Sequence, residues 1–180
     1  AYGLLRQARE ERGAIDLDLP ETKVKVVVGE DGKERPVSID ERLRVDSHRL
    51  IEEFMILANV AAASSLENKP CVYRVHDTPP SETSLEALRE TLKPYGLELP
   101  PGKIEDPKVF NNLMKEVSKL EDAQTLTRAI LRVQAKAIYD TENIGHFGLA
   151  LEKYAHFTSP IRRYADLLVH RSLVDEFNLG

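Results

Sequence analysis

The sequence of 180 residues predicts an α+β fold, in which an N-terminal helix and an antiparallel hairpin precede a helix-rich half. The hairpin is predicted by valines that alternate along a strand, followed by a Glu-Asp-Gly turn at 30–32. The helix-rich half is predicted by apolar residues that recur at helical spacing in several segments after residue 46. With 42% hydrophobic residues, the chain can bury a sizeable core as one domain or part of one.

The N-terminal elements are bounded by turn-forming residues. A short amphipathic helix is expected over 2–12, and it stops at Gly13 because glycine readily adopts the conformation that ends a helix. Strands are expected over 23–28 and 35–39, where apolar and polar side chains alternate around the turn. Their pairing gives the antiparallel hairpin.

A long helix is expected from Asp46, with Ser47 as the alternative cap, to about Leu66. Glu52 and Glu53 are expected to lie just off the core stripe of this helix, and one of them is expected to be solvated or paired with Arg49. The core stripe of this helix is predicted to consist of Leu50, Phe54, Leu57 and Ala61.

The second half contains shorter elements. A strand is expected over 70–75, helices over 81–92 and from 106 through 117, a helix over 122–139, and a further strand over 146–151. Arg128, Arg132 and Lys136 recur every four residues on one of these helices, and a solvated face is favoured over a phosphate-binding stripe. His76 and Asp77 lack further ligands nearby in the sequence, which favours a loop histidine over a metal pair.

Composition limits the classes of partner and compartment. The net charge of −5 offers no general attraction for nucleic acid, so RNA would need a local basic surface. The single cysteine, Cys71, excludes an internal disulfide and fits a reducing cytoplasm. No apolar run approaches the roughly 20 residues of a membrane span, so no membrane association is expected. The chain begins at Ala1 rather than Met, and an excerpt of a longer protein is expected.

The segment Thr158-Ser159-Pro160-Ile161-Arg162-Arg163 concentrates unusual chemistry. Ser followed by Pro is typical of a helix start, so a helix capped by Ser159 is expected from Pro160 to about Phe177. Both arginines would then lie in the first turn, where the helix dipole disfavours cations unless an anion binds there. Pairing with Asp166 is the structural alternative, but one carboxylate cannot easily serve both arginines.

The stretch HFGLALEKYAHFTSPIRRYADLLVHR, residues 146–171, resembles the signature of the RNB family of exoribonucleases. This family comprises the ribonuclease II and ribonuclease R enzymes, and ribonuclease R is the closer likeness. The stretches RGAIDLDLPE, RLIEEFMILAN and VYRVHD also resemble the family. Residues 1–180 would then be the C-terminal portion of an RNB catalytic domain, without the flanking cold-shock and S1 RNA-binding domains.

The resemblance implies hydrolytic 3′→5′ degradation of RNA from single-stranded 3′ ends to nucleoside 5′-monophosphates. It also implies Mg²⁺ in the full-length enzyme, bound by an upstream acidic segment rather than by this chain. The resemblance places Asp16 and Asp18 outside the metal site. Because the acidic segment lies upstream, the isolated chain is expected to be inactive. A noncatalytic RNA-binding or interaction module on the same scaffold is the alternative, and the presence of the acidic cluster upstream would distinguish the two.

The resemblance also implies roles for particular residues. Arg162 is expected to contact the scissile phosphate, and Arg163 to make a secondary phosphate contact or to pair with Asp166. Ser159 belongs to the same substrate-binding segment, although its role as a helix cap argues against a serine nucleophile. Glu52 is preferred as the carboxylate that binds ribose through its 2′-hydroxyl, with Glu53 in reserve and Asn59 as a weaker candidate. No chemistry is assigned to His146, His156, His170 or Tyr154.

Overall fold

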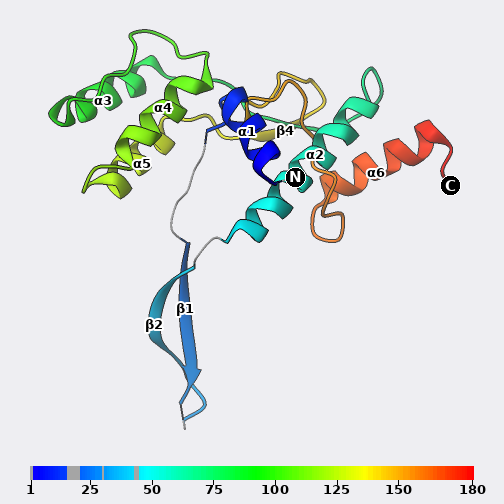
Figure 1. Ribbon diagram of the computed structural model, residues 1–180. Helices are drawn as coiled ribbons and strands as arrows, with labels where there is room; N and C mark the ends of the chain where they lie inside the picture. Colours follow the sequence, from blue (N-terminus) through cyan, green and yellow to red (C-terminus); the bar gives the residue numbers. More distant parts are fainter. Residues whose placement is uncertain (1, 16–20, 30, 43–44) are drawn as a thin grey trace.

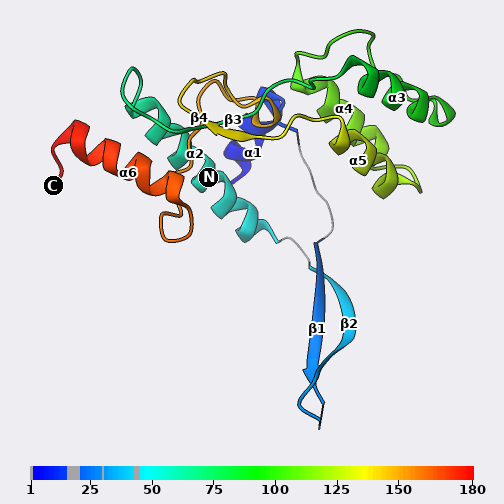
Figure 2. The ribbon, with the colours of Figure 1, turned by 180° about the vertical axis from the view of Figure 1, so that it is seen from behind.

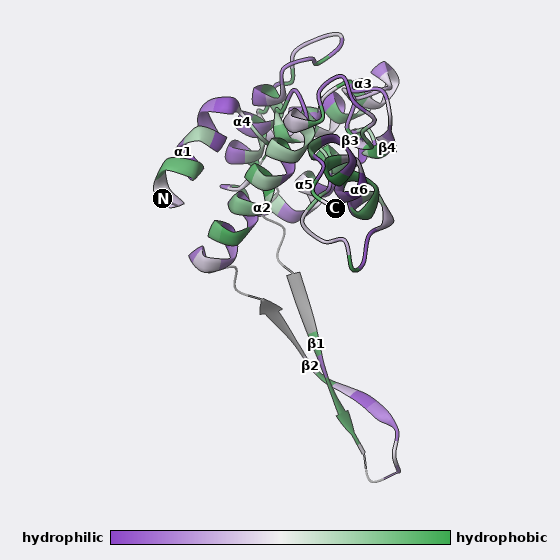
Figure 3. Ribbon diagram, turned by 90° about the vertical axis from the view of Figure 1, so that its right-hand side faces the viewer, coloured by the Kyte–Doolittle hydropathy of each residue, from purple (hydrophilic) through white to green (hydrophobic). Residues whose placement is uncertain are grey.

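The computed structural model describes residues 2–15, 21–29, 31–42 and 45–180. Its N-terminal part is a helix followed by a projecting hairpin (Figure 1). Helix α1 spans Tyr2–Arg12, and strands β1 (Glu21–Val28) and β2 (Glu34–Arg42) pair antiparallel with Val24 opposite Ile39. The predicted helix and hairpin are therefore confirmed. Figure 3 shows the hydrophobic stretch of β1 on the projecting hairpin, where Val24 and Val28 are 50% and 63% exposed.

The described residues form two hydrophobic cores. The first joins helices α2 (Asp46–Ser65) and α6 (Tyr164–Phe177) to a small sheet. This sheet pairs β3 (Tyr73–Val75) antiparallel with β4 (Ile138–Asp140). The small side chains of Ala62 and Ala63 on α2 allow close packing against this layer. The buried members of the core are Ala62, Ala63, Leu66, Cys71, Tyr73, Val75, Ala155 and Val169.

The other core lies within a group of three helices, α3 (Glu82–Leu92), α4 (Pro107–Val117) and α5 (Ala123–Arg132), with the short 3₁₀ helix η1 (Lys93–Tyr95) after α3. Figures 1 and 2 show this group at the opposite end of the molecule from α6. Ser81 caps α3 by accepting from the backbone N–H of Ser84, and Asp106 caps α4 ahead of Pro107. These caps are the local signals that predicted both helices.

The predicted core stripe of α2 is wrong. Phe54 and Leu57 are 46% and 47% exposed, whereas the buried face consists of Glu53, Ile56, Asn59, Ala62 and Ala63. Hydrophobic periodicity assumes that the most apolar face is the inner one. In α2 the inner face instead carries two polar side chains whose partners lie in other segments.

Two elements of the second half also differ from their predictions. The helix expected over 122–139 ends at Arg132, because the chain then extends into β4 to pair with β3. Arg128, Arg132 and Lys136 are all exposed, as the solvated interpretation predicts, but Lys136 lies beyond the helix. The strand expected over 146–151 is instead a 3₁₀ helix, η2 (Phe147–Leu149), which His146 caps by accepting from the N–H of Leu149. Among the helices of the described residues, none is a candidate to span a membrane.

Candidate functional site

Arg162 lies in a turn before α6 rather than inside a helix. The Ser159 carbonyl accepts from the backbone N–H groups of Arg162 and Arg163, at 3.3 and 3.2 Å, and α6 begins only at Tyr164. Arg163 is the N-cap residue in an extended conformation, and it makes no side-chain cap bond. The predicted helix start at Pro160 and the capping role of Ser159 are therefore wrong.

The physical reason for this late helix start is the carboxylate of Asp166, whose residue is fully buried. Its Oδ1 atom accepts from the backbone N–H of Ser159 at 2.7 Å and from Nη2 of Arg163 at 2.8 Å. Its Oδ2 atom lies 2.7 Å from Nε of Arg163. Residues 159–163 are thereby folded back over the first turn of α6 instead of extending it.

The ionisation of Asp166 follows from these partners. Burial alone raises the pKa of a carboxyl group, because it disfavours the charged form. Hydrogen bonds from Arg163 and Ser159, together with the charge of Arg163, outweigh this effect and leave the pKa of Asp166 lowered. Of the two alternatives for Arg163, the structure therefore provides the ion pair with Asp166.

Arg162 differs sharply from its neighbour. Its side chain is exposed and makes no hydrogen bond or ion pair within the described part of the chain. The two residues that precede it, Pro160 and Ile161, are also exposed, and Ile161 is 99% exposed. An unused guanidinium on a folded turn can offer parallel N–H donors to an anion such as a phosphate.

Asn59 of α2 holds the segment that leads into this turn, a role that the sequence did not suggest. The residue is 3% exposed, and its Oδ1 accepts from the backbone N–H groups of Phe157 and Thr158, at 2.9 and 3.2 Å. Its Nδ2 donates to the hydroxyl of Tyr154 at 3.0 Å. Asn59 lies at helical spacing from Glu52, but its partners lie about a hundred residues away along the chain. These contacts make it a structural anchor.

His156 lies close to Tyr139 and within the influence of several charged residues. The guanidinium of Arg74 lies 4.7 Å from the centre of the Tyr139 ring, and the Tyr139 hydroxyl is 2.7 Å from Nδ1 of His156. The pKa of His156 is lowered to about 4, chiefly by burial and next by the positive charge of Arg163, while the negative charge of Asp166 partly opposes this shift. His156 is therefore neutral at pH 7.

Three further histidines, His76, His146 and His170, make hydrogen bonds to the backbone. Nδ1 of His76 accepts from the N–H of Gly148 at 2.8 Å, which leaves Nε2 to donate to the carbonyl of Ala135 at 2.9 Å. Nε2 of His170 lies 2.9 Å from the carbonyl oxygen of Phe157, on whose ring the imidazole stacks. Burial, reinforced by the neighbouring His76, lowers the pKa of His146 to about 3.

The two candidate ribose carboxylates share one arginine of α1. Oε1 of Glu53 lies 2.9 Å from Nη1 of Arg9, and Oε1 of Glu52 lies 3.6 Å from the same atom. Glu53 is 7% exposed, whereas the side chain of Glu52 is 40% exposed. Glu52 also lines a cavity of about 410 Å³ whose wall includes His76 and Gln134. Glu53 is thus the structural member of the pair, with Arg9 of α1 as its partner.

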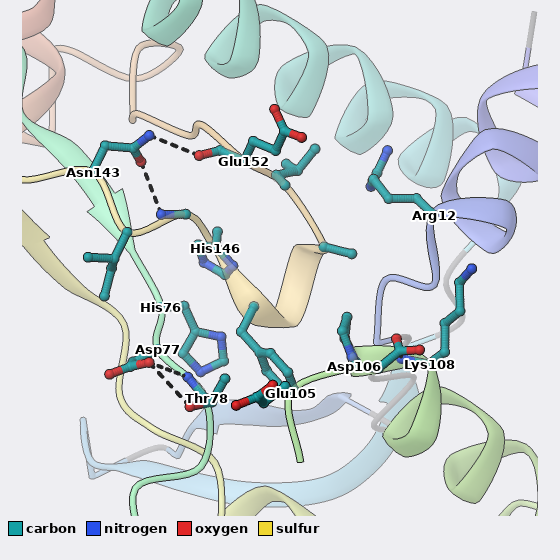
Figure 4. Close-up of a pocket in the computed structure, with 16 residues that line it drawn as sticks. Arg12, His76, Asp77, Thr78, Glu105, Asp106, Lys108, Asn143, His146 and Glu152 are labelled. Atoms are coloured by element: carbon teal, nitrogen blue, oxygen red, sulfur yellow. Dashed lines mark hydrogen bonds between the residues drawn. The ribbon is translucent and has the colours of Figure 1, made fainter. Parts of the chain in front are cut away.

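A second cavity, of about 680 Å³, is lined by side chains of both charges (Figure 4). Arg12 and Lys108 line this cavity together with carboxylates from three segments. Asn143 ties two parts of the wall, because its Oδ1 accepts from the N–H of Gly145 and its Nδ2 donates to the carbonyl of Glu152. Asp106 is already occupied as the cap of α4. The carboxylates of the wall are Asp77, Glu105, Asp106 and Glu152.

No metal-binding group emerges from the described residues. Among them, no set of three or more His, Cys, Asp or Glu side chains is placed to hold an ion. His76 follows β3 directly and forms an isolated β-bridge with His146. Asp16 and Asp18, which are predicted to lie away from the metal site, are outside the described residues. The described side chains do not fit a resident Mg²⁺.

Comparison with known proteins gives consistent similarities. Residues 2–177 match the family model described as RNB domain. Ribonuclease R of Vibrio cholerae is 45% identical over 174 residues, which cover 96% of this chain and 21% of that protein. The structure of Mycoplasma genitalium RNase R in complex with ribose methylated single-stranded RNA has a TM-score of 0.84 at 32% identity, covering 96% of this chain and 27% of that one.

A more distant structure is that of yeast Ssd1, described as a pseudonuclease. It has a TM-score of 0.58 at 26% identity and covers 72% of this chain and 17% of that one. The chain spans about a fifth of the length of the Vibrio cholerae relative. Since the family model matches all but a few terminal residues, the chain belongs to the RNB domain family.

Proposed function

We propose that this chain is part of a longer exoribonuclease that hydrolyses RNA in the 3′→5′ direction to nucleoside 5′-monophosphates. The observation that carries the proposal is the exposed guanidinium of Arg162, without a hydrogen bond or ion pair among the described residues, beside an Arg163 that is committed to Asp166. The similarity to ribonuclease R over 96% of the chain supports the same activity.

Arg162 would contact the scissile phosphate. Hydrolysis adds an oxygen to phosphorus, and negative charge grows on the phosphoryl oxygens as the pentacoordinate state forms. Two parallel N–H donors from one planar guanidinium can follow that charge with little reorganisation. Ser159 contributes through its backbone, because its carbonyl closes the turn that carries Arg162. A phosphate contact by its hydroxyl stays a prediction.

Glu52 would bind the ribose. Its side chain is the more exposed of the two carboxylates and lines a cavity, whereas Glu53 is buried against Arg9. An ionised carboxylate can accept the 2′-hydroxyl hydrogen that RNA has and DNA lacks. Glu53 would act indirectly, by fixing Arg9 beside Glu52.

Magnesium would be supplied by a part of the enzyme other than the described residues. Two-metal hydrolysis of a phosphodiester needs several carboxylates converging on cations roughly 3.5–4 Å apart. No such group exists among the described side chains, so we propose that the ligands come from a segment preceding this chain. The isolated chain would then be inactive. Its cytoplasmic location stays a prediction.

A noncatalytic RNA-binding or interaction module is the second candidate. It is favoured by the structural similarity to yeast Ssd1, which is described as a pseudonuclease. The two candidates differ in the segment before Ala1, because only the nuclease needs an acidic cluster there.

The test uses the full-length protein and a single-stranded RNA labelled at its 5′ end. The proposal predicts a ladder that shortens from the 3′ end, release of nucleoside 5′-monophosphates, and loss of both with EDTA until Mg²⁺ is restored. RNA blocked at its 3′ end and DNA of the same sequence serve as controls. Tight binding of RNA without any product would instead support the noncatalytic module.

A further inference from the structure

The turn that carries Arg162 has almost no hydrophobic support of its own. Ile161 is 99% exposed, Tyr164 is 67% exposed, and Pro160 is exposed as well. Burial of apolar surface therefore contributes little to its conformation. Whatever fixes the position of Arg162 must act through polar contacts at the two ends of the turn.

The first end is fixed by Asn59. One buried amide oxygen accepts from two successive backbone N–H groups, those of Phe157 and Thr158, while the amide nitrogen donates to Tyr154. These three bonds use both acceptor positions and one of the two N–H donors of the amide, and they determine its orientation. His170 holds the same segment from α6, by its hydrogen bond to the carbonyl of Phe157.

The second end is fixed by Asp166. Its buried carboxylate holds the N–H of Ser159 and the guanidinium of Arg163, which are the residues on either side of the turn 160–162. The carbonyl of Ser159 then closes the turn by accepting from the N–H of Arg162. The backbone of Arg162 is thus held between two buried side chains, while its own side chain stays exposed.

We infer that Asn59 and Asp166 are positioning residues that hold Arg162 ready for the scissile phosphate, rather than residues that only stabilise the fold. The inference rests on the proposed function. A turn that is ordered before RNA binds loses little conformational freedom when the phosphate arrives. Loosening either anchor would displace the guanidinium, and a displacement of about 1 Å can cost roughly 10²-fold in rate.

The test measures single-turnover cleavage and RNA binding by the full-length enzyme with Asn59→Leu or Asp166→Asn. Each change should lower the cleavage rate about 10- to 100-fold and weaken binding of long RNA much less. Asn59→Asp keeps an oxygen for both N–H groups, so it should recover most of the rate. Glu176→Gln is the matched control on α6, because it removes the ion pair with Lys69 without touching the turn, and it should cleave normally.

A double-mutant cycle separates positioning from general stability. If both anchors act through Arg162, adding either change to Arg162→Ala should cause no further loss of rate. If an anchor variant fails to fold, Arg163→Lys replaces it, since lysine keeps a cation beside Asp166 but not the planar fork. This variant should likewise slow cleavage, and should have no effect in the Arg162→Ala background.

Two outcomes overturn the inference alone. One is normal cleavage by folded anchor variants when Arg162→Ala is strongly impaired, and the other is a loss that persists in full in the Arg162→Ala background. Normal cleavage by Arg162→Ala itself would instead refute the role of this arginine in the proposed function, and the inference would fall with it.

Discussion

Arg162 and Arg163 are adjacent, but their surroundings predict that replacing them with alanine has very different effects on stability. Arg162 is exposed and unpaired among the described residues, so Arg162→Ala should change the free energy of unfolding by no more than about 0.5 kcal/mol. Arg163→Ala would leave a fully buried Asp166 without its cation. Breaking a buried pair costs about 3–5 kcal/mol, and the 20% exposure of the Arg163 side chain favours the lower end. At roughly 2–4 °C per kcal/mol, the melting temperature should fall by about 6–12 °C.

For the rate of cleavage, in contrast, Arg162→Ala should have the larger effect of the two. Loss of one preorganised donor to the reacting phosphate removes about 2.7–4 kcal/mol of transition-state stabilisation, or roughly 10²–10³ in turnover. Arg162→Lys keeps the charge but loses the planar fork, so it should recover only part of this rate. Binding of long RNA should change much less, because most of its phosphate contacts lie elsewhere along the strand.

The assay compares single-turnover cleavage, RNA binding and thermal melting for all three variants of the full-length enzyme. The expected pattern is slow cleavage at normal stability for Arg162→Ala, and lowered stability for Arg163→Ala. Near-normal cleavage by a folded Arg162→Ala enzyme would refute the assignment. Equal melting of the two alanine variants would show that the pair between Arg163 and Asp166 contributes little.

Three further predictions concern the sugar, the pH and the isolated chain. Glu52→Gln should reduce cleavage of RNA but not of a chimeric strand with deoxyribose at the cleavage end, whereas Glu53→Gln should mainly lower the melting temperature; equal losses of Glu52→Gln on both substrates would argue against a ribose contact. The pKa of His146 is lowered to about 3 and that of His156 to about 4, so the unfolded state takes up protons first as the pH falls below about 6.5. As the pH falls below that value, the free energy of unfolding should decrease by up to about 1.4 kcal/mol per pH unit for His146, and by less for the partly exposed His156, whose charge the solvent screens. Urea unfolding would measure this slope, and His146→Asn should reduce it; unchanged stability down to pH 5 would contradict the prediction. The pure 180-residue chain with Mg²⁺ should release no nucleotides from single-stranded RNA, and any steady release would place the metal ligands within it.

Local signals in the sequence predicted the elements that local interactions create. Ser81 and Asp106 cap their helices through backbone groups only a few residues away, and both helices begin where expected. The valines of β1 and the turn after them likewise define the hairpin with adjacent residues alone. The α+β class follows from these elements.

Elements that depend on distant partners could not be read from such signals. The end of α5 is set by the pairing of β4 with β3, more than sixty residues earlier in the chain. The late start of α6 is set by a carboxylate inside α6 that holds Ser159, a contact that the favourable Ser-Pro sequence does not reveal. Arg9 meets Glu52 and Glu53 only because α1 packs on α2.

Helix α2 links the two proposed contacts with the substrate. Glu52 and Asn59 are seven residues apart, which places them on similar sides of the helix about 10 Å apart along its axis. Between them Glu53 ties α2 to α1 through Arg9, while Asn59 ties it to the segment that leads to Arg162. Polar residues therefore occupy the buried face of α2 because they connect other segments to it, and this explains why hydrophobicity gave the wrong face. A helix used in this way would keep the ribose contact and the phosphate contact at a fixed separation, so that correct placement of the sugar also places the bond to be cleaved.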